Sequence, residues 1–322
     1  MKKRSLTGAF GLCVAVFLFA QKPVDLQKVN FITADKQSGK TLLIAEDDFT
    51  RNLSAFDLSA RLKTSQPVTK EAYLEFIGEQ TLDWTTDERK KMQTVFADIK
   101  KALSAYSLSF PETVYVVKTT GLEEGGSAYC RSINIIVLPE SVVADSEKEL
   151  RDTCLHELFH IYSRNNPEKR ERLYNILGFY KTGDLIIPEK LYGFKITNPD
   201  SVANNYYFNA RIENRTIPVM PLLFAAEQYD ENKGGEFFEY MLLLFFAVNA
   251  ESDASSLLTE NNKYKVFSIN QISNYYELIG ENTDYIIHAE EVLADNFVLA
   301  ANGETDVKTP ELLEKIKIEL KK

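Results

Sequence analysis

Residues 146–164 read SEKELRDTCLHELFHIYSR, and the rest of the chain has to be arranged around this stretch. Ser146 and Glu149 stand at the spacing of a capping box, which predicts a helix from Glu147 to Arg164 that ends before Pro167. Apolar side chains fill one broad arc of this helix and polar side chains fill the other. The pattern is typical of a helix that is buried on its back and carries a polar site on its front.

Two of the three histidines of the chain, His156 and His160, lie on the polar arc. Four helical steps bring two residues within about 40° of each other, so both imidazoles can bind one Zn²⁺. Glu157, one step further round, is expected near the metal as the general base that takes a proton from water. The alternative is accident, since composition alone produces this HExxH pattern in roughly one chain of this length in a hundred.

A catalytic zinc ion needs a third protein ligand and an open position. Glu291 is expected to be this ligand, because Asp295 lies one turn further along the same helix face and can hold a ligand histidine. Glu290 points about 100° away and is expected to be a solvated acid of the first helical turn. The remaining candidates for the third ligand are Glu168, Glu171 and His288.

These residues resemble the gluzincin class of zinc metallopeptidases, in which a glutamate on a later helix completes the site begun by HExxH. The stretch 285–297, YIIHAEEVLADNF, resembles a group of uncharacterised exported bacterial metallopeptidases, as do residues 119–138 and 196–200. The resemblance implies an α+β, zincin-like fold in which a small sheet packs its edge strand on the HExxH helix. It also implies Zn²⁺ as the cofactor. The ligands would be His156, His160 and Glu291, with Asp295 behind a ligand histidine.

The gap between His160 and Glu291 is far longer than in thermolysin-like proteases, so a large insertion is expected between the two site helices. This insertion is expected to shape the substrate cleft. The predicted organisation is a signal peptide over residues 1–20 and one metallopeptidase domain over residues 21–322. Within the domain we expect an N-terminal part 21–110, a core of 111–164 and 286–322, and the insertion 165–285.

The donor that stabilises the oxyanion is left open by the sequence. His288 precedes the second site helix, where it can serve as this donor, bind zinc, or cap and pack the helix. Tyr285, Tyr206 and Tyr207 are rival donors, and no spacing argument ranks them.

Residues 126–129 lead into a strand predicted over 128–138. In gluzincins such a strand edges the cleft and pairs with extended substrate, so Ala128 and Tyr129 are expected to contact a peptide. An ordinary strand of the sheet is the alternative for these residues.

Cys130 and Cys154 are the only cysteines beyond the predicted signal peptide. Export permits a disulfide between them, and two buried free thiols are the equal alternative, because sequence does not establish connectivity.

Hydrophobic periodicity predicts further strands and helices in an α+β chain. Strands are expected over 29–33, 41–45 and 113–118, with a hairpin over 206–225. Helices are expected over 85–103, 236–248 and 290–301, and from Pro310 onwards. Residues 34–41, ADKQSGKT, formally fit a relaxed phosphate-loop pattern, but the first glycine is absent and a strand-like run follows. A polar hairpin turn is therefore expected there.

A basic start followed by an uncharged apolar run, residues 6–20, predicts a secretory signal peptide cleaved after Ala20. The alternatives are a lipoprotein signal at Cys13 and an uncleaved membrane anchor. The protein is expected to be exported, either periplasmic or extracellular. No later segment is long and apolar enough to span a membrane.

The chain has 37 basic and 47 acidic residues, a formal net charge of −10, and lacks the basic stripe of a nucleic-acid-binding protein. The sequence therefore predicts an exported zinc-dependent peptidase that acts on a peptide or protein through a metal-activated water. The alternatives are a non-catalytic, zinc-stabilised binding protein and a hydrolase of cell-wall peptides.

Overall fold

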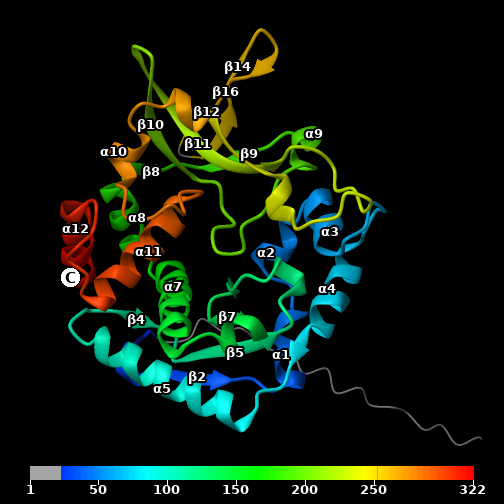
Figure 1. Cartoon of the computed structure of the whole chain (residues 1–322). Coiled ribbons are helices and arrows are strands. Elements are labelled where there is room, and N and C mark those ends of the chain that lie inside the picture. The colour runs from blue at the N-terminus through cyan, green and yellow to red at the C-terminus, as the bar shows by residue number, and fades with distance from the viewer. Residues whose placement is uncertain (1–22, 252) are drawn as a thin grey trace, which may run out of the picture.

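The computed structural model describes residues 23–251 and 253–322, so the predicted signal peptide lies outside the described residues. Two β-sheets lie on opposite sides of a central group of helices (Figure 1). The mixture of several sheets with many helices confirms the α+β class. No helix within the described ranges is long and apolar enough to cross a membrane.

The first sheet has five strands, ordered β2-β5-β7-β6 with β3 beside β5. Their bounds are Asn30–Thr33 for β2, Thr81–Leu82 for β3, Thr113–Thr119 for β5, Tyr129–Arg131 for β6 and Ile135–Pro139 for β7. Strands β2, β5 and β7 run parallel, whereas β6 is antiparallel to β7 and forms an edge. The single strand predicted over 128–138 is in fact this hairpin, because the chain reverses at Ser132, whose φ is 51°.

Side chains alternate between the two faces of this sheet, as the pleat requires. Ile136 and Leu138 pack with helices α5 and α7, whereas Ile135 and Val137 pack on the opposite side with α1 and α4. The helices are α1 Lys36–Leu43, α4 Lys70–Glu79, α5 Thr86–Ala102 and α7 Glu147–Asn165. The sheet therefore holds α7, which carries HExxH, on one of its faces.

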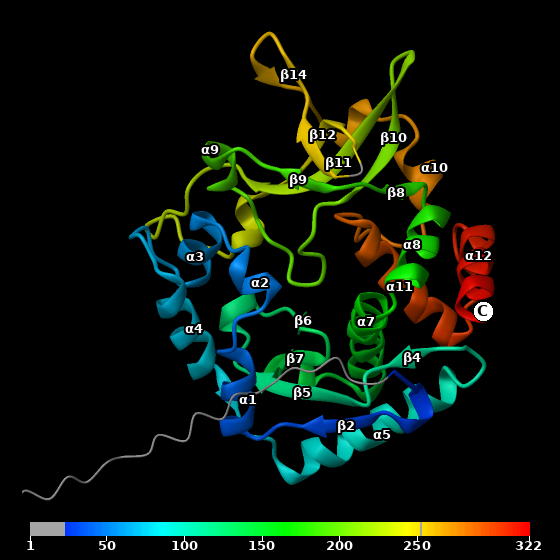
Figure 2. The same cartoon turned by 180° about the vertical axis from the view of Figure 1, so that it is seen from behind.

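Helix α11, Ala289–Asn302, packs along α7, and both views show the two helices side by side (Figure 2). Helices α8, Pro167–Ile176, and α12, Pro310–Leu320, pack around this pair. The helices predicted over 85–103, 147–164 and 290–301 and from Pro310 are confirmed.

The second sheet is ordered β8-β10-β11-β12-β13-β9, with β16 beside β12. Its strands are β8 Phe179–Lys181, β9 Asp184–Ile186, β10 Tyr206–Ile212, β11 Arg215–Ala225, β12 Met241–Asn249, β13 Ala254–Leu257 and β16 Val266–Phe267. The predicted hairpin is confirmed as β10 and β11, which close at the pair Ile212 and Arg215. One face of this sheet joins the main core through Phe208 and Phe245.

Two further predicted elements are wrong. The residues predicted as a helix over 236–248 form a short 3₁₀ turn, Phe237–Tyr240, followed by strand β12. The prediction failed because a strand buried inside a sheet is a continuous apolar run, and such a run shows no periodicity that distinguishes it from a buried helix. The strand over 41–45 lies mostly in α1, where Asp35 caps the helix by accepting from the amide of Ser38. Residues 34–41 therefore do not form the expected hairpin turn but contain the start of a helix. The first backbone amides of this helix donate to carboxylates.

The remaining elements are short. They are helices α2 Asp48–Arg51, α3 Ala55–Arg61, α6 Glu140–Ala144, α9 Glu189–Tyr192 and α10 Tyr275–Ile279, and strands β1 Val24–Asp25, β4 Ser109–Phe110, β14 Thr259–Glu260 and β15 Lys263–Tyr264. Short 3₁₀ turns occupy Leu26–Lys28, Leu122–Glu124 and Ile269–Gln271.

A buried ion network ties α3 to the loop that precedes β6. The guanidinium of Arg61 donates to Glu124 and to Asp57, each at 2.7 Å, and all three side chains are almost completely excluded from solvent. The same guanidinium also donates to the carbonyl of Thr197 at 3.3 Å. Removing one partner of such a network leaves uncompensated buried charge.

We expect Arg61→Met to lower the free energy of unfolding by about 3–5 kcal/mol, because Glu124 and Asp57 lose their counter-ion in the interior. Urea unfolding measures the change. Arg51→Met is the matched control, since Arg51 pairs with Asp48 at the surface, and we expect about 1 kcal/mol or less from it. Equal effects of the two substitutions would contradict this account.

Glu123, beside this network, is fully buried, and one of its carboxylate oxygens has no hydrogen-bond partner among the described residues. Burial raises the pKa of Glu123 to about 7 from its ordinary value of 4.5. Folding therefore favours the protonated form. The stability that this group contributes is complete below pH 4.5 and is lost as the pH rises through 7.

Between pH 5 and pH 8, we expect the wild-type protein to lose roughly 2.5 kcal/mol more unfolding free energy than Glu123→Gln loses. The amide cannot ionise, so its burial carries no such pH dependence. Chemical denaturation at several pH values gives the two slopes. The exposed Glu112→Gln variant should follow the wild-type curve, and a Glu123→Gln curve that also did so would refute the assignment.

Candidate metal centre

The HExxH helix starts as its sequence predicts. The hydroxyl of Ser146 accepts from the amide of Glu149, and the carboxylate of Glu149 accepts from the amide of Ser146, which completes the capping box. Leu150, Cys154 and Leu158 are fully buried on the back of the helix. This fixed rotation turns the two histidines toward α11.

Both imidazoles converge on one carboxylate of α11. The Nε2 atom of His156 lies 3.1 Å from Oε2 of Glu291, and the Nε2 atom of His160 lies 3.4 Å from the same oxygen. His160 and Glu291 are each only 1% exposed, whereas the His156 side chain is 17% exposed. The structure thus brings Glu291, far away in the chain, to the position predicted for it.

Each histidine is oriented through its other ring nitrogen. Nδ1 of His156 lies 2.8 Å from Oδ1 of Asp295, and Nδ1 of His160 lies 3.2 Å from Oε1 of Glu290. An ionised carboxylate can only accept, so each Nδ1 carries the hydrogen. The Nε2 atoms are thus the ring nitrogens that face Glu291, and once deprotonated they can bind a metal, as the corresponding atoms of metal-binding histidines usually do.

Glu290 is therefore not the solvated acid that the sequence suggests. It is 2% exposed, and besides His160 its carboxylate accepts from the hydroxyls of Tyr174 at 2.5 Å and Ser163 at 2.8 Å. Burial raises the pKa of Glu290, but the hydrogen bonds with His160 and Tyr174 and the charges of His160 and Arg170 together outweigh burial and leave the pKa below its ordinary value. The helices α8 and α7 supply these partners, and helix periodicity does not reveal them.

The donor set fits a tetrahedral zinc ion. Two atoms that are each about 2.0–2.1 Å from such an ion lie about 3.3 Å apart, close to the two separations from Glu291. The ligand atoms of His156, His160 and Glu291 all lie within 4.8 Å of one another. Burial lowers the pKa of His156, but hydrogen bonds with Asp295 and Glu291 raise it to about 10. The side chains of His156, His160 and Glu291 together therefore favour binding of a cation.

Glu157 lies on the same helix, beside this centre. Its side chain is 3% exposed, and its Oε2 atom accepts from the thiol of Cys130 at 3.2 Å. Burial raises the pKa of Glu157, against the opposing effect of the two histidines. A raised carboxyl pKa suits a group that takes up and returns a proton.

A cleft of about 530 Å³ opens onto His156, Glu157 and Glu291, so the centre has an accessible side. Ala128 lines this cleft, whereas the Tyr129 side chain is buried on the opposite face of the sheet. The prediction of substrate contact is therefore restricted to Ala128 and to the backbone of the strand.

The oxyanion candidates lie in different places. Tyr285 lines the cleft and stacks on His156, with ring centroids 6.1 Å apart. Burial, together with neighbouring carboxylates, raises the pKa of Tyr285, so its hydroxyl remains a donor. Tyr207 packs against Tyr180 in the second sheet, and Tyr206 lines a different cavity.

His288 caps α11 and does not line the cleft. Its Nδ1 atom accepts from the amide of Glu290 at 3.1 Å, and its Nε2 atom faces the hydroxyl of Ser201 at 3.2 Å. This placement corresponds to the capping alternative.

Cys130 and Cys154 are free and buried, so the disulfide alternative is wrong. The Cys130 thiol is engaged with Glu157 instead, and Cys154 packs in the main hydrophobic core. Burial raises the pKa of both thiols, which keeps them protonated.

The predicted insertion contributes two polar residues that sequence reasoning missed. Asn198 donates to Oε1 of Glu291 at 2.6 Å, and Asp200 accepts from the amide of Cys130 at 2.8 Å. The resemblance noted over 196–200 was the only signal, and it named no residue. No protein-family model, curated protein or solved structure matches this chain.

We expect Asp295→Asn and Glu290→Gln each to weaken zinc binding by about 10–100-fold, because each replaces the charged acceptor that orients one histidine with a weaker, uncharged amide. Competition against a chelating dye measures the affinity. Glu147→Gln, at an exposed position of α7, is the control and should bind zinc like the wild type. Unchanged affinity in both acid variants would exclude an orienting role for these carboxylates.

Proposed function

We propose that this protein is an exported, zinc-dependent peptidase with a zincin-like fold of the gluzincin type. The observation that carries the proposal is the convergence of His156 and His160 on Glu291 while their Nδ1 atoms are held by separate carboxylates. The HExxH helix lies on a sheet whose edge strand, β6, is preceded by residues 126–128, and these line the cleft. Both features support the resemblance.

His156, His160 and Glu291 would hold the ion, and Asn198 fixes the free oxygen of Glu291. Bound zinc supplies a Lewis acid that polarises the peptide carbonyl and makes a water molecule acidic. Asp295 and Glu290 keep both histidines in the tautomer that binds a metal.

Glu157 takes the proton from the attacking water and returns it to the leaving amine. Its position beside His156 at the cleft, and its buried carboxylate, suit this exchange. The Tyr285 hydroxyl, kept protonated, donates to the oxyanion that forms on the substrate carbonyl.

A peptide is the substrate that this cleft favours. The backbone of the edge strand at Ala128 can pair with an extended chain. The amide of Cys130 is already bonded to Asp200, so the strand offers its free edge only before that residue.

We expect Glu157→Gln to keep its zinc and to lose about 10²–10⁴-fold in peptide cleavage, because the amide preserves shape but accepts no proton. Purified protein is incubated with a peptide library, with and without chelator, and metal content is measured by mass spectrometry. The control is Glu147→Gln, which should cleave like the wild type.

If Glu157→Gln loses its zinc, Glu157 is a ligand and the assigned roles are wrong. If folded, zinc-loaded wild-type protein cleaves neither the library nor cell-wall peptides, the peptidase proposal fails and a zinc-stabilised binding protein is favoured. Cleavage of cell-wall peptides alone would restrict the substrate to that class.

A further inference from the structure

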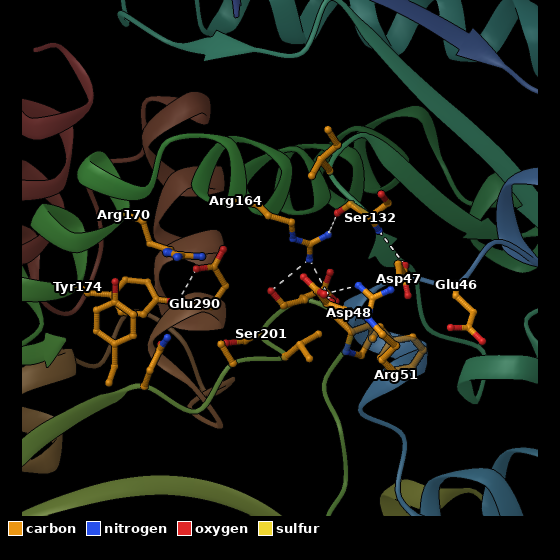
Figure 3. Close-up of a pocket in the computed structure, with 18 residues that line it drawn as sticks. Glu46, Asp47, Asp48, Arg51, Ser132, Arg164, Arg170, Tyr174, Ser201 and Glu290 are labelled. Atoms are coloured by element: carbon orange, nitrogen blue, oxygen red, sulfur yellow. Dashed lines mark hydrogen bonds and ion pairs between the residues drawn. The ribbon is translucent and has the colours of Figure 1, made fainter. Parts of the chain in front are cut away.

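A second cavity, of about 470 Å³, shares Asp200 with the cleft and has no role in the proposed reaction (Figure 3). Its walls come from α2, the end of α7, α8 and the segment that leads into β10. The volume is typical of pockets that bind small molecules.

Three arginines line this cavity, and two of them have no carboxylate partner. Arg51 pairs with Asp48 at 2.6 Å. Arg164 donates to backbone carbonyls, those of Ser132 and of Pro199. Within the described ranges, no carboxylate lies within ion-pair distance of Arg164 or Arg170, and the buried Nε atom of Arg170 has no hydrogen-bond partner.

A second buried donor lies beside Arg170. The Tyr206 side chain is 6% exposed, it lines the same cavity, and its hydroxyl, whose oxygen faces Arg170, has no acceptor for its proton among the described residues. A buried donor without an acceptor costs free energy, and native structures rarely leave one unexplained. A guanidinium and a hydroxyl together indicate an acceptor ligand that carries negative charge.

The acids around the cavity do not supply this acceptor. Asp47 pairs with Arg131 at 2.6 Å, on the side away from Arg170. Glu290 lies close to Arg170 in Figure 3, but its oxygens already accept from His160, Tyr174 and Ser163. The charge of Glu290 therefore stabilises Arg170 without a direct ion pair, and the Nε–H group of Arg170 remains available to a ligand.

We propose that this cavity binds a small ligand through a carboxylate group, which Arg170 and Tyr206 hold. A guanidinium matches the two oxygens of a carboxylate, and Arg164 lines the same cavity, whereas Arg51 is paired with Asp48. A singly charged carboxylate is preferred over a phosphate dianion because the ionised carboxylate of Glu290 also lines the cavity and would repel a second charge.

The proposed carboxylate site is separated from the metal centre by the side chain of Glu290. Glu290 lines the cavity and also orients His160, so a carboxylate on Arg170 would lie next to the residue that positions a ligand histidine. The inference does not depend on the peptidase proposal, because it concerns a binding site with its own readout.

Calorimetric titration of the full chain with four probes tests the proposal: butyrate, inorganic phosphate, and one short peptide with either a free or an amidated C-terminus. We expect saturable binding of butyrate or of the free-ended peptide. Arg170→Gln should weaken this binding by at least about tenfold, since a charge-assisted pair is lost. Butyrate alone would identify a free organic acid, and the free-ended peptide alone would identify a peptide C-terminus.

Two further variants separate binding from folding. Tyr206→Phe removes only the hydroxyl and keeps the ring beside Tyr174, 4.4 Å away by centroids, so it should weaken binding without lowering stability. Arg172→Gln, which removes an exposed arginine of the same helix, should bind like the wild type. Binding of no probe, binding of phosphate only, or equal binding by wild type and Arg170→Gln would overturn the proposal.

Discussion

The contact between two imidazoles of α7 and three carboxylates of α11 is the constraint on which the rest of the structure depends. Glu290 and Glu291 are almost fully buried, and buried carboxylates are stable only when they are paired and hydrogen-bonded. His156 and His160 supply those partners, so the two helices must meet at one rotation and one register. The sheet, α8 and the predicted insertion then enclose this contact.

The part of this contact that follows from the periodicity of an α-helix can be predicted from the sequence. The spacing of His156 and His160 and the spacing of Glu291 and Asp295 each put a pair on one helix face. The role of Glu290 could not be predicted in this way. Its burial depends on Tyr174 and Ser163, which reach it through packing between helices that are far apart in the chain.

The same limit explains the errors in secondary structure. Residues 242–248 are uniformly apolar, and only their pairing with β11 shows that they form a strand. Residues 41–45 look like a strand until Gly39 and Leu43 are seen to be buried on one side of α1. The α+β class was predictable because most other elements, such as the hairpin over 206–225, carry their own turn or capping signals.

The segment around Thr197 and Asn198 couples the second sheet to the centre and is fixed in place. The Thr197 amide donates to Asp57, and the Thr197 carbonyl accepts from Arg61, so this segment is hydrogen-bonded to the buried ion network. Asn198, the next residue, donates to Glu291. Moving the segment would break hydrogen bonds to charged groups that no water could replace in the interior. The segment is therefore held by the ion network on one side and by Glu291 on the other, and Asp200, which follows it in the chain, lines both cavities.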